Sequence, residues 1–108
     1  MNLSSISVRH AVPGNALYGA AKTAVEQVTR VFAKEVIAFG ITANVLSLPL
    51  VERVGMGVAL PDVAVADALQ HTALGRAVTP QEVAHAVDCF LTPQSGIIAG
   101  QILYLGGP

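Results

Sequence analysis

Apolar and polar residues alternate with two different periods along this chain, and the alternation predicts strands and helices in turn. Short apolar and partly β-branched runs at residues 1–5, 41–48 and 101–105 are typical of strands. Between the first two runs, residues 15–39 carry apolar side chains at helical spacing, namely Ala24, Val25, Val28, Val31, Phe32, Val36 and Phe39. Strands and helices that alternate in this way are typical of an α/β fold with a parallel sheet.

The expected helices have recognisable start and stop signals. Asn15 can cap the first long helix, and Gly40 can end it. Thr79 and Glu82, three residues apart, form a capping-box pattern that predicts a second long helix over residues 80–91. The pattern therefore predicts two long helices between the strands.

The remaining segments contain turn and breaker residues. Residues 8–14 are expected to form a loop with a Pro-Gly turn. Residues 51–72 are interrupted by Gly55 and Gly57, which predicts a mobile or helical insertion with a helix over about residues 62–71. The whole pattern predicts about three strands, two long helices and a short helical insertion.

Composition narrows the class of protein. Apolar residues make up 53% of the 108-residue chain and charged residues 12%, against about a quarter charged in average globular domains. A sheet covered on both faces has such a composition, and this length corresponds to one domain or part of one. The net charge is −1 and the basic residues are scattered singly, so neither nucleic acid nor a membrane surface is expected as a partner.

Membrane insertion and secretion each require a recognisable sequence signal. No apolar run reaches the roughly 18 residues of a membrane helix, and there is no secretory signal pattern. The one cysteine, Cys89, allows no internal disulfide and is expected to be packed among apolar neighbours. These observations predict a cytoplasmic protein.

Three polar residues in the first quarter of the chain could form a reaction site. Tyr18 and Lys22 are four residues apart, which places them on one helix face, one turn apart. A cationic amine beside a phenol favours the phenolate, and such a tyrosine can exchange a proton with a carbonyl or alcohol oxygen. Ser5 ends the first strand, so its hydroxyl could hydrogen-bond the same oxygen. The Tyr-x-x-x-Lys spacing alone often arises by chance, and the serine and the strand-loop-helix context give it weight.

Five segments, in the same order along the chain, carry a family resemblance. They are N-L-S-S at residues 2–5, Y-G-A-A-K at 18–22, G-I-T-A-N-V at 40–45, L-G-R-A-V-T-P-Q-E-V-A at 74–84 and I-I-A-G-Q-I-L-Y-L-G-G at 97–107. In these segments the chain resembles the short-chain dehydrogenase/reductase family, most closely its 3-oxoacyl-carrier-protein reductases. The resemblance implies the C-terminal half of a Rossmann-like, doubly wound parallel sheet over residues 1–108.

The resemblance also implies roles for the three polar residues. Tyr18 would be the general acid/base, and Lys22 would favour its phenolate and hold the nicotinamide ribose. Ser5 would orient the carbonyl of a small carbonyl or alcohol substrate. Ser4 and Ser7 also offer hydroxyl groups, but only Ser5 has the family's spacing to Tyr18.

NAD or NADP is the cofactor that the resemblance implies, and Tyr18, Lys22, Pro49 and Val51 would form the nicotinamide side of its site. The family's G-x-x-x-G-x-G turn, which receives the pyrophosphate, does not occur in these residues. We therefore expect a chain without the dinucleotide-binding half, inactive in isolation. Leu48-Pro49 stands where the family has Pro-Gly, unless an alignment gap retains Pro49 and deletes the glycine.

The three histidines, His10, His71 and His85, share no metal-ligand spacing, so no metal site is expected. His10 lies between Ser5 and Tyr18 and is either a surface residue or part of the lining of a substrate cleft.

Two functions are compatible with these features. One is an NAD(P)-dependent carbonyl/alcohol oxidoreductase, and the other is a non-catalytic assembly module derived from such an enzyme. In the resembled family, the helices corresponding to residues 15–39 and 80–91 build subunit interfaces, so a homo-oligomer is expected with either function.

Overall fold

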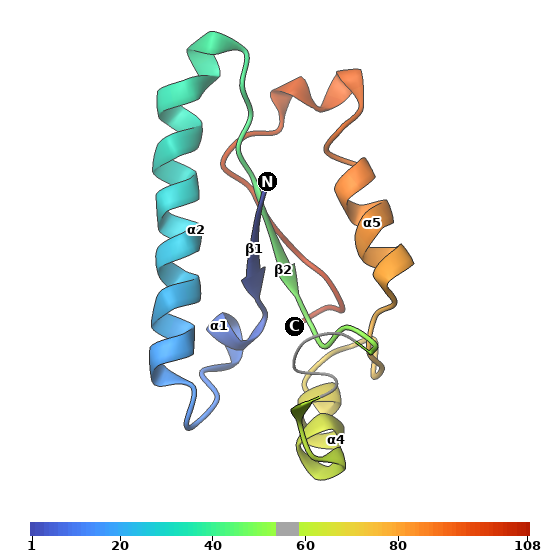
Figure 1. Ribbon diagram of the computed structural model, residues 1–108. Helices are drawn as coiled ribbons and strands as arrows, with labels where there is room; N and C mark the ends of the chain where they lie inside the picture. The colour runs from blue at the N-terminus through green and yellow to red at the C-terminus, as the bar shows by residue number, and fades with distance from the viewer. Residues whose placement is uncertain (54–58) are drawn as a thin grey trace.

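A parallel sheet of three strands lies at the centre of the computed structural model, which describes residues 1–53 and 59–108. The strands are β1 (Asn2–Ser5), β2 (Val45–Leu48) and β3 (Ile102–Tyr104), in the order β1-β2-β3 (Figure 1). Each lies within a run of residues predicted to be a strand. The predicted α/β class with a parallel sheet is therefore confirmed.

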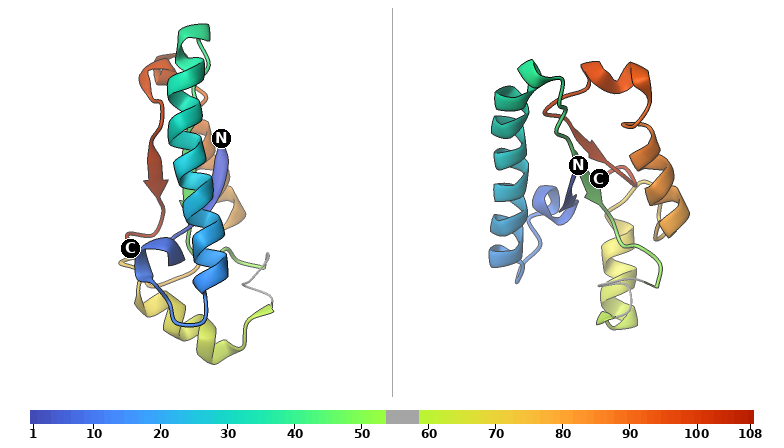
Figure 2. Two further views of the ribbon diagram at one scale, coloured as in Figure 1. Left: turned by 90° about the vertical axis from the view of Figure 1, so that its left-hand side faces the viewer. Right: turned by 45° about the horizontal axis from the view of Figure 1, so that its top comes forward.

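Helices flank this sheet. In chain order they are α1 (Ser7–His10), α2 (Ala16–Val36), η1 (Ile37–Phe39), α4 (Asp62–Gln70), α5 (Pro80–Asp88) and η2 (Pro93–Ile97). The long helix α2 and the shorter α5 lie on opposite sides of the sheet, and α4 lies beyond the ends toward which β1 and β2 point (Figure 1, Figure 2). The helix predicted over residues 62–71 is confirmed as α4, while Gly55 and Gly57 lie outside the described residues.

The contact between α2 and β1 is a polar seam. Lys22 Nζ donates to the backbone carbonyl of Leu3 at 3.1 Å, and the Ser4 hydroxyl donates to Glu26 Oε1 at 2.7 Å. One turn further along, Asn2 Nδ2 donates to Thr29 Oγ1 at 2.9 Å. Because these helix residues are spaced by four and three positions, they form one stripe that follows β1 along its length.

The predicted apolar stripe of this helix faces largely away from the sheet. Val28 is 64% exposed, and Val31, Phe32 and Phe39 are exposed as well. The buried residues of α2 are instead Glu26, Thr29 and Ala33. The apolar spacing predicted the helix correctly, but it did not identify the face that meets the sheet.

The ends of α2 agree only partly with the predicted caps. Gly40 has φ 74°, a left-handed conformation that glycine adopts without strain, and its N–H bonds to the carbonyl of Ile37. Asn15 is the N-cap residue, as predicted, but its side chain makes no capping bond. The loop predicted over residues 8–14 was also partly wrong, because α1 occupies its first part. The N–H of Ser7 donates to the Ser5 hydroxyl oxygen at 3.3 Å where this short helix begins.

Strand β2 is shorter than the run of residues 41–48 predicted for it. Before the strand begins, the side chain of Asn44, and not its backbone, links the chain to the segment that precedes β3. Asn44 Nδ2 donates to the carbonyl of Ile98 at 2.7 Å, and its Oδ1 accepts from the N–H of Gln101 at 2.9 Å. Val45 and Leu46, which follow, are fully buried in the centre of the sheet.

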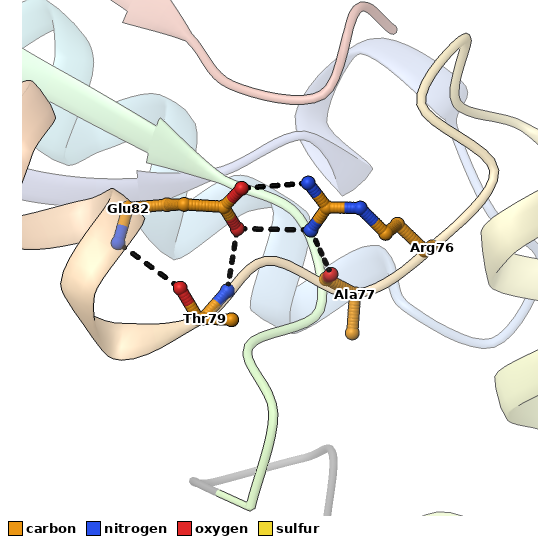
Figure 3. Close-up of polar contacts among 4 residues, drawn as sticks. All are labelled: Arg76, Ala77, Thr79 and Glu82. Atoms are coloured by element: carbon orange, nitrogen blue, oxygen red, sulfur yellow. Dashed lines mark hydrogen bonds and ion pairs between the residues drawn. The ribbon is translucent and has the colours of Figure 1, made fainter.

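The capping box predicted before α5 is confirmed. Thr79 Oγ1 accepts from the N–H of Glu82 at 3.1 Å, and Glu82 Oε2 accepts from the N–H of Thr79 at 2.8 Å (Figure 3). Arg76 adds two hydrogen bonds to the same carboxylate, at 2.9 Å and 2.6 Å. The side chain that caps the helix is thereby tied to the segment that precedes it.

The helix α5 ends at Asp88, three residues before the predicted end. The carbonyl of Cys89, just after this end, accepts a 2.7 Å hydrogen bond from the hydroxyl of Ser95 in η2. Cys89 is exposed, so the predicted packing of this thiol is wrong. In residues 1–53 and 59–108, no helix has the length and apolar character needed to cross a membrane.

Candidate functional site

A cavity of about 470 Å³ lies where β1 and β2 end, and it is lined by the sequence-predicted residues Ser5, Tyr18, Lys22, Pro49 and Val51. Its volume lies within the range of small-molecule sites. In open α/β sheets, ligands bind beyond the carboxyl ends of the strands, which is where this cavity lies. The structure thus brings all five predicted residues to one cavity.

Tyr18 and Lys22 reach the cavity from the first two turns of α2. The Lys22 ammonium lies 5.8 Å from the centroid of the Tyr18 ring, and its one hydrogen bond within the described residues is to the Leu3 carbonyl. The Tyr18 side chain is partly exposed. The two side chains thus border the same cavity from one side of α2.

Ser5 reaches the cavity from the last position of β1. Its Oγ accepts hydrogen bonds from the N–H of Ser7 at 3.3 Å and from the Ser7 hydroxyl at 3.0 Å. Both contacts use Ser5 as an acceptor, which leaves its own hydroxyl proton to be donated. Ser5 is buried, so a ligand oxygen that entered the cavity would receive this proton with little competition from solvent.

Pro49 and Val51 form the wall contributed by the chain after β2. Val51 pairs with Val78 in an isolated parallel bridge, which ties this wall to the segment before α5. Gly106, with φ 83°, lies against Pro49: a methyl group at Gly106 would come within 3.3 Å of Pro49 Cγ. The carbonyls of Gly106 and Gly107 accept from the N–H groups of Leu74 and Ala73 at 3.0 Å and 2.8 Å.

The helix α4 contributes cavity residues that the sequence did not indicate. Asp67 and His71 line the cavity, and His71 Nε2 lies 3.9 Å from Asp67 Oδ1. His10, at the end of α1, lines the cavity as well, with its ring centroid 5.6 Å from that of His71. From the sequence, His10 could be either a surface residue or part of the lining of a cleft. The structure places it in the lining of the cavity.

No group of three or more His, Cys, Asp or Glu side chains suited to a metal ion occurs in the part of the chain that the structure describes.

Comparison with known proteins identifies the family. Residues 1–107 match the family described as enoyl-(acyl carrier protein) reductase. The chain belongs to the short-chain dehydrogenase/reductase family. The 3-oxoacyl-(acyl-carrier-protein) reductase of Thermotoga maritima is 31% identical to this chain over 107 residues. The match covers 99% of this chain and 43% of that relative.

Solved structures of the family share the fold. A short-chain dehydrogenase/reductase of Serratia marcescens has a TM-score of 0.83 at 29% identity, over 97% of this chain and 43% of its own. An actinorhodin polyketide ketoreductase solved with NADPH has a TM-score of 0.84 at 25% identity, over 98% of this chain and 44% of its own. The chain thus spans less than half the length of these relatives. The fold is that of the matching part of a Rossmann-type short-chain dehydrogenase/reductase domain.

Proposed function

We propose that this chain forms the catalytic side of an NAD(P)-dependent oxidoreductase that interconverts a carbonyl and an alcohol. The single observation that carries the proposal is that Ser5, Tyr18 and Lys22, which come from two elements, line one cavity. Family membership supports the same reaction class.

In this proposal, each of the three residues has a separate task. Ser5 donates its hydroxyl proton to the substrate oxygen and orients it. Tyr18 gives a proton to that oxygen during reduction and takes one during oxidation. Lys22 stabilises the phenolate that Tyr18 then becomes, because its ammonium lies on the same helix face.

The cofactor site is proposed on the same wall of the cavity. Tyr18, Lys22, Pro49 and Val51 border the space that a nicotinamide ribose would need, and NAD or NADP would accept or supply the hydride there. The NADPH in the ketoreductase structure supports a dinucleotide for this family. These 108 residues contain no G-x-x-x-G-x-G turn, so the pyrophosphate has no receptor of that kind in them.

A chimera provides the test. The part of the Thermotoga maritima reductase that this chain does not match would be joined to residues 1–108, and NADH and NADPH oxidation would be followed with a panel of small ketones. We expect turnover that falls about 10²–10⁴-fold in Tyr18→Phe and strongly in Ser5→Ala and Lys22→Ala.

The matched control is Tyr104→Phe, because Tyr104 lies in β3 and does not line the cavity. Retention of most turnover in Tyr18→Phe would refute the assignment. The isolated chain serves as a second comparison, and we expect calorimetry to detect no micromolar binding of either cofactor.

The exposed apolar face of α2 favours a second role, that of an assembly module. Leu17, Val28 and Phe32 expose apolar surface on this helix, as does Phe39 of the adjoining η1, and such surface marks interaction sites. We propose that α2, and with it α5, takes part in self-association, with or without catalysis.

A further inference from the structure

Two imidazole rings from different elements meet at the wall of the cavity. His10 is the last residue of α1 and His71 directly follows α4, so 60 positions of the sequence separate them. Their ring centroids are 5.6 Å apart, and the ring planes are tilted by 39°. Neither local sequence spacing nor helix periodicity brings these two rings together. Their contact depends on how α4 is placed relative to α1.

One nitrogen of this pair lacks a partner. His10 Nε2 is buried and makes no hydrogen bond to any residue that the structure describes. A buried polar atom without a partner is costly, and native proteins usually satisfy such atoms with another group or a ligand. Since His10 lines the cavity, a molecule that entered the cavity could supply the missing acceptor.

The charges around the cavity favour an anionic acceptor. Lys22, His10 and His71 can each carry a positive charge, and Asp67 is the one carboxylate among the described lining residues. Much of the remaining wall is apolar, with Ile6, Val12, Leu50 and Leu60 among its members. Low-polarity surroundings strengthen the attraction between an imidazolium and a carboxylate.

We propose that His10 and His71 bind the carboxylate of an oxo acid or hydroxy acid whose reacting oxygen lies at Ser5 and Tyr18. The position of the reacting oxygen rests on the proposed function. The carboxylate contact rests on the imidazole pair alone. A neutral ester of the same size offers His10 Nε2 only an uncharged carbonyl oxygen, which is a weaker acceptor than a carboxylate, and therefore binds more weakly.

The test uses the full 108-residue chain, with levulinate and methyl levulinate as probes. These two molecules share a ketone and differ in the charge of the second group. Histidine side-chain NMR should show saturable shifts of His10 and His71 with levulinate, and the ester should bind about tenfold more weakly or worse. Equal affinity for acid and ester would overturn the proposal.

Variants at the two histidines give a second readout. His10→Phe and His71→Phe should each weaken levulinate binding about tenfold or more, because a hydrogen bond to a charged group is lost. His85→Phe is the matched control, since His85 lies on α5 and does not line the cavity. Levulinate affinities equal to that of the control variant would contradict the assignment.

A pH series keeps the proposal testable if the variants do not fold. Imidazole gains its proton between about pH 5 and pH 8. Lys22 and Tyr18 of α2 and Asp67 of α4 are the other titratable groups that line the cavity among the described residues. Levulinate affinity should fall as the pH rises through the window, while ester affinity should not. An unchanged levulinate affinity would refute the proposal.

This binding test is independent of hydride transfer. A chimera without turnover would therefore refute the oxidoreductase while leaving the carboxylate site in place. The reverse result, turnover without the acid preference, would refute the carboxylate site alone.

Discussion

The Ser4 hydroxyl donates a 2.7 Å hydrogen bond to the carboxyl of Glu26, and the two residues are only 3% and 4% exposed. Removing one partner leaves the other buried and unpaired, which costs more than the bond itself contributes. We expect Ser4→Ala and Glu26→Ala each to lower the free energy of unfolding by about 1–3 kcal/mol, as measured by urea denaturation.

The matched control is Glu35→Ala, because Glu35 lies on the same helix and is exposed. The double variant Ser4→Ala with Glu26→Ala should lose less stability than the sum of the two single variants, since neither polar group then remains buried. Strictly additive losses in that double variant would show that the two residues do not act as a pair.

Acid should weaken the tie between Arg76 and Glu82. The hydrogen bond from Arg76 and then that from the Thr79 N–H lower the pKa of Glu82 from 4.5 to about 2. Because the folded-state pKa is the lower one, this contribution to stability is present above about pH 4.5 and is lost as the pH falls toward about 2. Unfolding by urea, followed across this range by circular dichroism, measures the loss.

Glu82→Gln should remove that part of the pH dependence, because the variant has no carboxylate to protonate. Glu35→Gln makes the same charge change on an exposed helix position without an ion pair among the described residues. If the Glu82 and Glu35 variants keep the same pH dependence as the unmodified chain, the ion pair contributes nothing to stability.

The exposed apolar face of α2 should make the chain self-associate. Val28 is 64% exposed and Phe32 is 47% exposed. Removing such apolar surface from water is favourable, and this favours association of two chains through α2. We expect light scattering to find a dimer or larger species at micromolar concentration. Val28→Asp and Ala24→Arg should weaken it, because each places a charge in the contact.

Gln94→Asp provides the comparison for this surface. Gln94 is exposed in η2, away from α2, so a charge there should leave the association unchanged. A monodisperse monomer of the unmodified chain would contradict the proposal, as would equal weakening by all three charge variants.

Local signals in the sequence predicted the elements well. The capping box needed only Thr79 and Glu82, three residues apart, and the C-terminal glycine cap of η1 needed only Gly40. That Ser5, Tyr18 and Lys22 lie close together could likewise be predicted, because their spacing combines one strand end with one helix turn. These features depend on short sequence separations, which propensity and pattern describe directly.

Contacts between distant segments could not be predicted in this way. The spacing of Val28 and Phe32 identifies an apolar helix face, yet α2 turns Glu26 and Thr29 toward the sheet because β1 offers partners at Ser4 and Asn2. His71 lies beside His10 only because of where α4 is placed. The residues next to either histidine in the sequence give no information about that placement.

Gly106, which follows β3, lies behind the cavity wall without lining the cavity itself. A methyl group there would lie 3.3 Å from Pro49 Cγ and 3.8 Å from Thr72 Cβ, and Pro49 and Thr72 both line the cavity. A larger residue at position 106 must therefore displace the wall that it meets. The shape of the cavity can change through a position that no ligand touches, so a comparison that considers only the lining residues would miss the cause.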